Sequence, residues 1–241
     1  TGVKLSDLLR ETGLKPKAKW VLAEGSDTSG MTRSIPIEKI LDDCLIAWAM
    51  NGEALRPEQG YPARLVVPGW EGNMWVKWIR RLEFGDKPYM TREETSKYTD
   101  LLTDGKARMF TWVMEAKSVV TSPSPEKPIL HKGIQQLRGL AWSGKGKIKR
   151  VDVSLDGGKN WRTAQLHAPI MSKSLVRFTL PFEWSGEELL IQSRAIDETG
   201  YVQPYIQELQ KIRGKNSIYH NNSIATWLVS KSGRVDNVRL G

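Results

Sequence analysis

The sequence has few of the residues that form metal clusters and disulfides. Its 241 residues include one cysteine, Cys44, and three histidines that lie far apart. A single cysteine excludes an intrachain disulfide and leaves the redox compartment undefined. Scattered histidines do not give the spacing that is typical of zinc sites. Because Cys44 lies in the apolar stretch DDCLIAWAM, we expect a buried and unreactive thiol.

Long apolar runs and one-sided tracts of charge are also missing. No apolar run approaches the length of a membrane span, so we expect no contact with a membrane. Hydrophobic residues at 39% and charged residues at 26% are typical of a globular protein. A net charge of +9 favours anionic partners. Acids and bases are interspersed and no nucleic-acid-binding motif is present, so nucleic acid is a weak alternative and is not among the expected partners.

The residue pattern of the first quarter of the chain predicts two helices and two strands. We expect helices at residues 3–14 and 34–43 and strands at residues 18–27 and 44–55. Gly13 is a stop signal for the first helix. Ser34 is the expected cap of the second helix, with Pro36 in its first turn. Asn51-Gly52 predicts a tight turn at the end of the second strand.

Residues 59–78, QGYPARLVVPGWEGNMWVKW, combine a turn, two apolar segments and two cations. Arg64 lies at the entry of the strand and Lys77 near the end of the stretch. A mostly apolar segment buries charge only when the charge has a partner, and no carboxylate stands nearby in sequence. Two interpretations stay open: both cations extend to water, or they hold an anion together.

The second half of the chain has a different pattern. Ser122-Pro123-Ser124-Pro125 predicts a stiff connector, and we place a domain border near Lys117, between residues 1–117 and 118–241. Short segments with period-two alternation and Gly or Pro turns then predict an antiparallel β-sandwich of immunoglobulin type. Asp156-Gly157-Gly158 predicts a hairpin turn.

No cysteine pair can join the two sheets of this sandwich. We therefore expect the large side chains Trp142, Trp161 and Phe178 to fill its core.

Residues 59–78 and 141–161 resemble the sulfite oxidase family of molybdopterin enzymes. The matching residues of the first stretch are Gly60, Tyr61, Pro62, Arg64, Val66, Val67, Pro68, Gly69, Val76, Lys77 and Trp78. Gln59 departs from the pattern, because the family has His at this place. The resemblance implies an α+β chain: the C-terminal part of a mixed α/β molybdopterin-binding domain, followed by an immunoglobulin-like dimerisation domain.

The resemblance also implies a cofactor site. Arg64, Lys77 and the backbone around Trp75 and Val76 would hold the pterin phosphate, a role that suits an arginine fork and a lysine point charge. Asp27 would lie beside the pterin. From the residues alone, a turn aspartate more often bonds its own backbone.

Two catalytic residues follow from the same resemblance. Tyr98 would donate a hydrogen bond to the substrate, and Arg213, in KIRG, would reach towards the metal from the β-sandwich. From the residues alone, Tyr98 is equally a half-buried interface tyrosine, and Arg213 a surface cation at a helix end.

The family's cysteine ligand for molybdenum comes from a segment before the first helix, and Cys44 does not match it. The chain starts without Met or a signal peptide, inside the expected domain. We therefore expect a truncated fragment that is inactive and binds no molybdenum by itself, although the full-length enzyme carries molybdopterin.

The segments at 87–98, 194–204 and 217–240 resemble one branch of the family, the molybdenum subunits of sulfane dehydrogenase in the bacterial sulfur-oxidation (Sox) system. This implies oxidation of sulfane sulfur on a sulfur-carrier protein, as in thiosulfate oxidation, a dihaem cytochrome c subunit as electron acceptor, a homodimer and a periplasmic location. Two alternatives stay open: a sulfite dehydrogenase, and a non-catalytic module for dimerisation or cytochrome docking.

Overall fold

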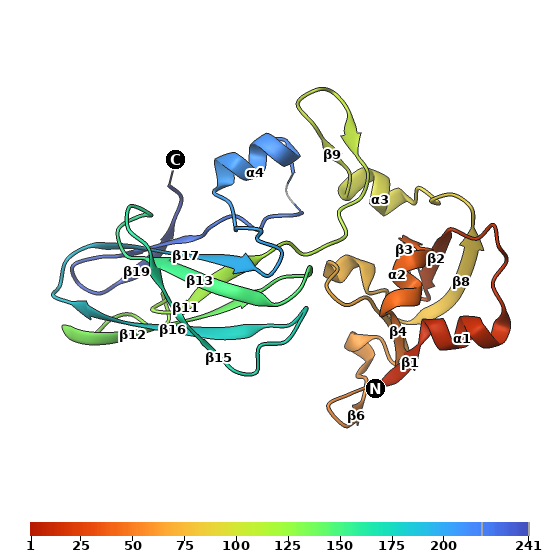
Figure 1. The fold of residues 1–241 in the computed structure, drawn as a ribbon, viewed down its shortest axis with the longest axis horizontal. Coiled ribbons are helices and arrows are strands. Elements are labelled where there is room, and N and C mark those ends of the chain that lie inside the picture. Colours follow the sequence, from red (N-terminus) through yellow and green to blue (C-terminus); the bar gives the residue numbers. More distant parts are fainter. Residues whose placement is uncertain (218, 241) are drawn as a thin grey trace. The chain divides into compact units, whose positions relative to one another are not determined.

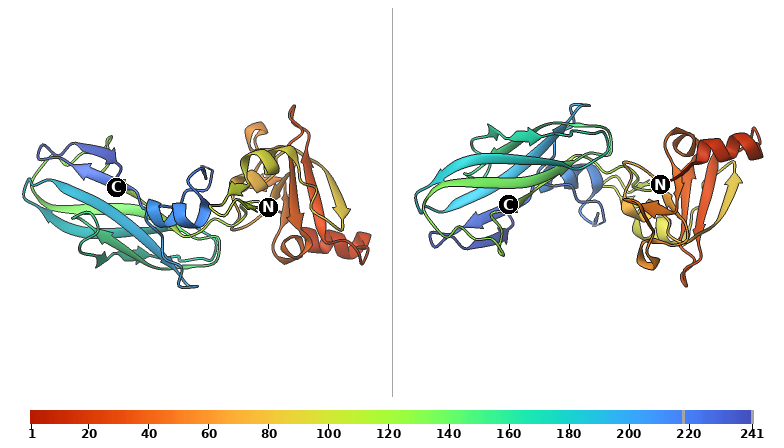
Figure 2. Two further views of the ribbon diagram at one scale, coloured as in Figure 1. Left: turned by 90° about the horizontal axis from the view of Figure 1, so that it is seen from above. Right: turned by 90° about the horizontal axis from the view of Figure 1, so that it is seen from below.

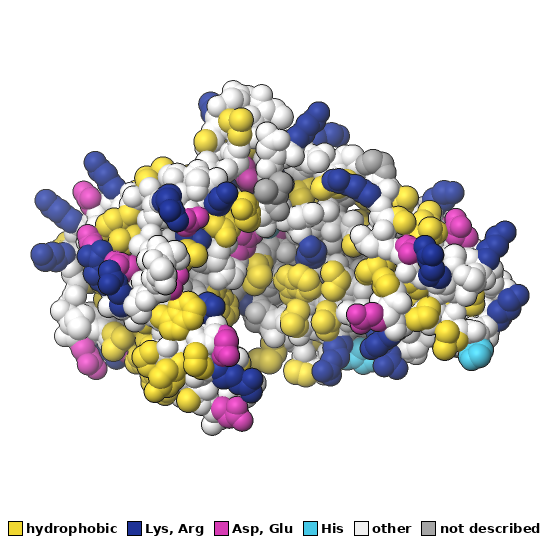
Figure 3. Space-filling view, turned by 180° about the vertical axis from the view of Figure 1, so that it is seen from behind, with side chains coloured by type: hydrophobic (Ala, Val, Ile, Leu, Met, Phe, Trp, Pro, Cys, Tyr) yellow, Lys and Arg dark blue, Asp and Glu magenta, His cyan; other side chains and the backbone are white. Residues whose placement is uncertain are grey.

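The computed structural model describes residues 1–217 and 219–240, which divide into two compact units. The first unit contains residues 1–101 and 105–112, and the second contains residues 102–104 and 113–241. The predicted border residue, Lys117, is the first residue of strand β11 (Figure 1). On the face drawn in Figure 3, Lys and Arg side chains are spread out and do not form one stripe.

The first unit contains two small antiparallel sheets. The strands are β1 (Gly2–Lys4), β4 (Leu45–Ala47) and β7 (Arg64–Val66) in one sheet, and β3 (Thr32–Pro36), β2 (Trp20–Gly25) and β8 (Ile79–Gly85) in the other. Two short hairpins join β5 (Ala49–Met50) to β6 (Glu53–Ala54) and β9 (Asp100–Leu101) to β10 (Ala107–Arg108). The helices are α1 (Leu5–Thr12), α2 (Ile37–Asp42) and α3 (Arg92–Lys97), with 3-10 turns η1 (Pro57–Gln59) and η2 (Gly72–Met74).

Helix α1 confirms the amphipathic pattern of the N-terminal stretch. It buries Leu5 and Leu9, and it ends at Gly13, whose φ of +78° favours glycine. It starts at Leu5 because the preceding residues pair with β4.

The expected cap of α2 is wrong. Ser34 lies inside strand β3, fully buried, and α2 begins only at Ile37 after Pro36. The backbone N–H and the hydroxyl of Ser34 both donate to Glu94, so this serine joins β3 to α3.

The second unit is the predicted sandwich of two antiparallel sheets (Figure 2). One sheet contains β11 (Lys117–Ser122), β12 (Gly133–Trp142), β16 (Val176–Trp184) and β15 (Gln165–His167) in that order. The other contains β14 (Arg162–Thr163), β13 (Ile148–Ser154), β17 (Leu189–Asp197), β18 (Thr226–Val229) and β19 (Val235–Val238). Helix α4 (Ile206–Arg213) follows β17. Strands β13 and β14 pair as a hairpin through the predicted turn, in which Gly157 and Gly158 have φ of +75° and +92°.

The core of the sandwich differs in part from the expectation. Phe178 is fully buried, but Trp142 and Trp161 are only partly buried and lie outside the core cluster. The Trp161 ring instead lies 4.2 Å from the Arg194 guanidinium carbon. The core cluster around Phe178 consists mainly of aliphatic side chains from both sheets, together with Phe182 and Trp184.

Candidate functional site

The five predicted cofactor residues lie together at one place in the first unit. Arg64, on β7, is half-buried and donates from Nη2 to the Trp75 carbonyl (2.9 Å) and from Nη1 to the Gln59 carbonyl (3.0 Å). Its guanidinium carbon also lies 5.7 Å from the Trp75 ring centre. The Trp75 indole donates in turn to the Trp70 carbonyl at 3.0 Å. Arg64 and Trp75 therefore hold each other in place.

Lys77 reaches the same turn as Arg64. Its Nζ donates to the Glu58 carbonyl at 2.8 Å, and Arg64 donates to the next carbonyl, that of Gln59. The turn passes so close to Lys77 that a Cβ on Gly60 would lie 2.9 Å from the Lys77 Cβ. Gly60 also has a φ of +104°. The two cations thus converge on one turn of the chain.

Asp27 completes this group from the end of β2. Its carboxylate accepts the Met31 backbone N–H at 2.9 Å and the Ser29 hydroxyl at 2.8 Å. These hydrogen bonds, with a smaller contribution from the charge of Lys77, lower the pKa of Asp27. Asp27 therefore bonds its own turn, as a turn aspartate does, and also lies within electrostatic reach of Lys77.

Gly25 packs β2 against the predicted cofactor segment. A Cβ there would lie 2.7 Å from the Lys77 carbonyl oxygen and 3.3 Å from both Val76 Cγ1 and Asp27 Oδ1. Close approach of the backbone therefore requires glycine at this position.

The group fits an anionic ligand. Within the described residues, neither Arg64 nor Lys77 forms an ion pair with a carboxylate. Burial lowers the pKa of Arg64, so its charge is only partly solvated. Two converging cations that form no ion pair are suited to a phosphate group such as that of molybdopterin.

Tyr98 follows helix α3 and is half-buried. Its ring centre lies 4.9 Å from the guanidinium carbon of Arg33, a residue of β3 that is 1% exposed. Arg33 donates from Nε to Asn73 Oδ1 (3.2 Å) and from Nη1 to the Thr32 carbonyl (2.7 Å). Its Nη2 is buried and has no hydrogen-bond partner among residues 1–217 and 219–240.

Arg33 was not among the predicted site residues. Period-two alternation places Met31, Arg33 and Ile35 on one face of a strand, so an arginine beside a core isoleucine was the available signal. Burial lowers the pKa of Arg33, and the neighbouring Tyr98 and Glu94 oppose that effect.

Glu94 positions α3 and hence Tyr98. Residues 91–100 are mostly polar, a pattern typical of a solvated segment, yet Glu94 is 1% exposed. Its carboxylate accepts hydrogen bonds from the Ser34 hydroxyl (2.9 Å) and the Thr91 hydroxyl (3.0 Å), as well as from both backbone N–H groups. Sequence reasoning missed this residue because its partners come from two distant segments.

In the second unit, Arg213 ends helix α4 and is 5% exposed, so the surface-cation alternative is wrong. Its Nη2 lies 3.4 Å from Oε2 of Glu115. The same oxygen lies 3.2 Å from His220 Nε2, and the Lys145 ammonium lies 3.6 Å from the other carboxylate oxygen. The hydroxyl of Tyr201 donates to Glu115 at 3.1 Å.

Glu115 is the anionic centre of this network. Burial opposes its ionisation, but the hydrogen bond from His220 and the charges of Arg213, His220 and Lys145 outweigh that effect and lower its pKa to about 2. Burial, with the negative charge of Glu115, raises the pKa of Tyr201 to about 12. Glu115 and His220 lie far apart in the chain, and no local motif marks either of them.

Cys44 is 1% exposed, which confirms the expectation of a buried thiol, and its sulfur donates to the Lys39 carbonyl at 3.2 Å. In the part of the chain that the structure describes, no three Cys, His, Asp or Glu side chains form a group that could hold a metal ion. No helix in that part is both long and apolar enough to cross a bilayer.

Two family models match the chain. Residues 1–93 match the oxidoreductase molybdopterin binding domain, and residues 108–227 match the Mo-co oxidoreductase dimerisation domain. The mitochondrial sulfite oxidase of Drosophila melanogaster is 32% identical over 89% of this chain and 42% of that protein. The sulfite oxidase of Gallus gallus is 33% identical over 84% of this chain and 49% of that protein.

With this site and these two domains, the chain belongs to the sulfite oxidase family of molybdopterin oxidoreductases. The resemblance and the α+β fold that it implied are confirmed. Among solved structures, the sulfane dehydrogenase SoxCD from Paracoccus pantotrophus is 61% identical, with a TM-score of 0.96 over 100% of this chain. The chain spans less than half of the two sulfite oxidases and 62% of that SoxCD chain.

Proposed function

We propose that this chain is part of a molybdenum-dependent dehydrogenase that oxidises sulfane sulfur bound to a carrier protein. The observation that carries the proposal is the convergence of Arg64 and Lys77 on one turn, where neither forms an ion pair with another described residue. The 61% identity to sulfane dehydrogenase SoxCD favours sulfane sulfur over free sulfite as the substrate.

Molybdopterin, when bound, would supply the oxygen-atom transfer and two-electron chemistry. Arg64 and Lys77 would bind its phosphate, and Asp27 and the backbone of Trp75 and Val76 would line the same site. The Tyr98 hydroxyl would donate a hydrogen bond to the substrate.

Arg213 would attract the negative charge of the substrate from the second domain. Removal of a desolvated guanidinium in such a role costs roughly 2–5 kcal/mol of binding free energy.

The partners and the location are part of the same proposal. A c-type cytochrome with two haems would accept the electrons, residues 118–241 would form the homodimer interface, and the enzyme would act in the periplasm. Residues 1–117 would be the cofactor-binding domain.

We further propose that the 241-residue chain alone does not retain molybdenum. Its single cysteine, Cys44, is 1% exposed and donates to a backbone carbonyl, so it offers no accessible thiolate. Metal analysis of the purified chain tests this, and stoichiometric molybdenum would overturn it.

The function is tested with a longer protein that includes a cysteine-bearing segment before Thr1. We expect this protein to reduce cytochrome c with a sulfane-loaded carrier, and to do so much more slowly with free sulfite. Arg64→Met and Lys77→Met should each lower the bound pterin content, whereas the exposed Lys87→Met should not.

Two other outcomes separate the alternatives. Faster turnover with free sulfite would favour a sulfite dehydrogenase, and the relatives at 32% and 33% identity, which are named sulfite oxidases, act on the same substrate. No turnover and no pterin in the longer protein would favour a non-catalytic dimerisation or docking module.

A further inference from the structure

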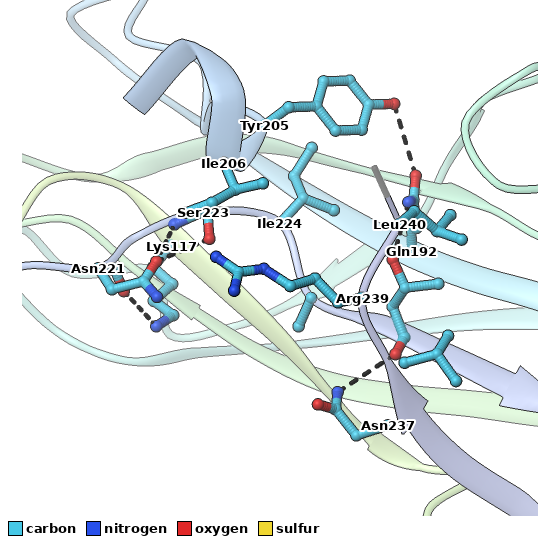
Figure 4. A pocket seen from close by; sticks show the side chains of 13 residues that line it. Lys117, Gln192, Tyr205, Ile206, Asn221, Ser223, Ile224, Asn237, Arg239 and Leu240 are labelled. Atoms are coloured by element: carbon cyan, nitrogen blue, oxygen red, sulfur yellow. Dashed lines mark hydrogen bonds between the residues drawn. The ribbon is translucent and has the colours of Figure 1, made fainter. Parts of the chain in front are cut away.

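The β-sandwich unit contains a polar pocket that none of the predicted site residues lines. Its volume is about 340 Å³, and it lies beside the N-terminal end of α4 and the end of β19 (Figure 4). Its polar lining residues are Lys117, Gln192, Tyr205, Asn221, Ser223, Thr226, Asn237 and Arg239. The pocket therefore needs an explanation separate from the cofactor site.

Two cations point into this pocket. Figure 4 shows Arg239 extending across the pocket towards Ser223 and Lys117, which come from different segments of the chain. None of the lining residues that the structure describes is acidic. Two like charges directed into one recess repel each other unless an anion lies between them.

Neither cation is neutralised by the protein. The Lys117 ammonium donates to the Asn221 carbonyl, a neutral partner, and burial lowers the pKa of Lys117. Arg239 forms no ion pair with another residue of the described ranges. Both side chains thus keep donors available for a ligand.

The neutral groups around the cations are also suited to oxyanion recognition. The side-chain amides of Asn221 and Asn237 each carry two N–H donors, of which Asn237 uses one for the Thr226 carbonyl at 3.2 Å. The hydroxyls of Ser223 and Tyr205 donate to the side-chain oxygens of Asn221 and Gln192, so the free donors around the cations are those of the amides. The Asn221 side-chain oxygen accepts from the Ser223 backbone and hydroxyl at 3.0 and 2.7 Å, which fixes the orientation of its amide.

We propose that this pocket binds a small oxyanion, with Lys117 and Arg239 as its charged ligands. An arginine fork and a lysine point charge are the usual pair for tetrahedral oxyanions and carboxylates. A metal ion is disfavoured because the described lining offers two cations and no carboxylate. An extended nucleic-acid chain is disfavoured because the two cations line a single pocket and not an extended groove.

The reactivity of Lys117 tests the proposal at the residue level. The 241-residue chain is treated briefly with acetic anhydride in chloride, sulfate, phosphate or acetate at matched ionic strength, and peptide mass spectrometry gives the modification rate of each lysine. We expect sulfate or phosphate to slow acetylation of Lys117 at least fivefold. Lys231, an exposed lysine outside the pocket, should change less than twofold.

The variant Arg239→Gln is the matched control. Arg239 is exposed, so this substitution should leave the fold intact while it abolishes the protection of Lys117. Stronger protection by acetate than by sulfate would identify a carboxylate as the ligand. Equal Lys117 rates in all four salts, or protection that survives Arg239→Gln, would overturn the proposal. The readout needs neither cofactor nor turnover, so it is independent of the proposed enzymatic function.

Discussion

At the scale of single residues, Glu115 determines the charge of the site around Arg213. One carboxylate receives contacts from Arg213, His220, Lys145 and Tyr201. Because the pKa of Glu115 is lowered to about 2, the carboxylate is ionised at all physiological pH values. It therefore offsets part of the positive charge of Arg213, the residue to which the proposed function assigns substrate attraction.

The stability of the network should depend on pH in a defined window. The folded pKa of Glu115 lies below its ordinary value, so its contribution is full above about pH 4.5 and is lost as pH falls towards 2. The shift corresponds to about 3 kcal/mol at most. We expect Glu115→Gln to lower the free energy of unfolding by about 1–3 kcal/mol at pH 7 and by little near pH 2.

Urea unfolding of both proteins between pH 7 and pH 2 measures this difference. Glu126→Gln, at an exposed position, serves as the control and should leave the curve unchanged. Equal losses for Glu115→Gln at pH 7 and pH 2 would show that the pKa shift does not stabilise the fold.

At the scale of elements, helix α3 depends on one buried side chain. Glu94 joins the start of α3 to β3 through Ser34 and Thr91. Its removal would leave several buried donors without a partner, which costs about 1–3 kcal/mol for each donor. We expect Glu94→Ala to lower the free energy of unfolding by about 2–4 kcal/mol and to loosen the loop that carries Tyr98.

Chemical denaturation and hydrogen exchange of residues 92–98 measure the two effects. The neighbouring Glu93, which pairs with Arg92, offers the matched variant Glu93→Ala, with an expected loss below about 0.5 kcal/mol. If Glu93→Ala and Glu94→Ala behaved alike, the buried hydrogen bonds would not be what holds α3.

In the sandwich, strand β12 can pack closely only because it contains Gly139. A Cβ at this position would lie 2.1 Å from Phe178 Cζ and 2.5 Å from the Val119 carbonyl oxygen. Gly139→Ala should therefore displace the Phe178 ring and lower the midpoint of thermal unfolding, at a cost of about 1–3 kcal/mol. Gly72→Ala, where the added carbon meets no atom within 4 Å, is the control, and an equal loss there would refute the steric explanation.

At the scale of the whole molecule, the sandwich could be predicted because its signals are local. Period-two alternation and the Asp156-Gly157-Gly158 turn lie within one short stretch, and each strand follows the pattern of its own residues. That Arg64 and Lys77 lie at one place could also be predicted, since both residues belong to one stretch of the sequence.

The remaining features depend on contacts between distant segments. Glu94 bonds Ser34, Arg33 packs on Tyr98, and Glu115 meets His220 only after the chain has folded. Trp142 and Trp161 were assigned to the core by size alone, but which face of a strand a side chain occupies depends on register. The local pattern could at best mark Arg33 as a buried cation, and it does not identify the distant partner of any of these residues.

The second unit should be able to fold without the first. The core of the sandwich draws on residues between Ala116 and Val235, all of them within the second unit. Because no side chain of the first unit belongs to this core, residues 113–241 should fold independently and unfold cooperatively. Expression of this segment, with near-ultraviolet circular dichroism and thermal unfolding, measures the outcome.

The substitution Gly139→Ala provides the internal check on this last prediction. In the isolated segment it should lower the unfolding midpoint by the same amount as in the 241-residue chain, because its neighbours Phe178 and Val119 are both retained. A segment that lacks a near-ultraviolet signal would mean that the sandwich core needs the first unit to form. The same conclusion would follow if Gly139→Ala left the stability of the isolated segment unchanged.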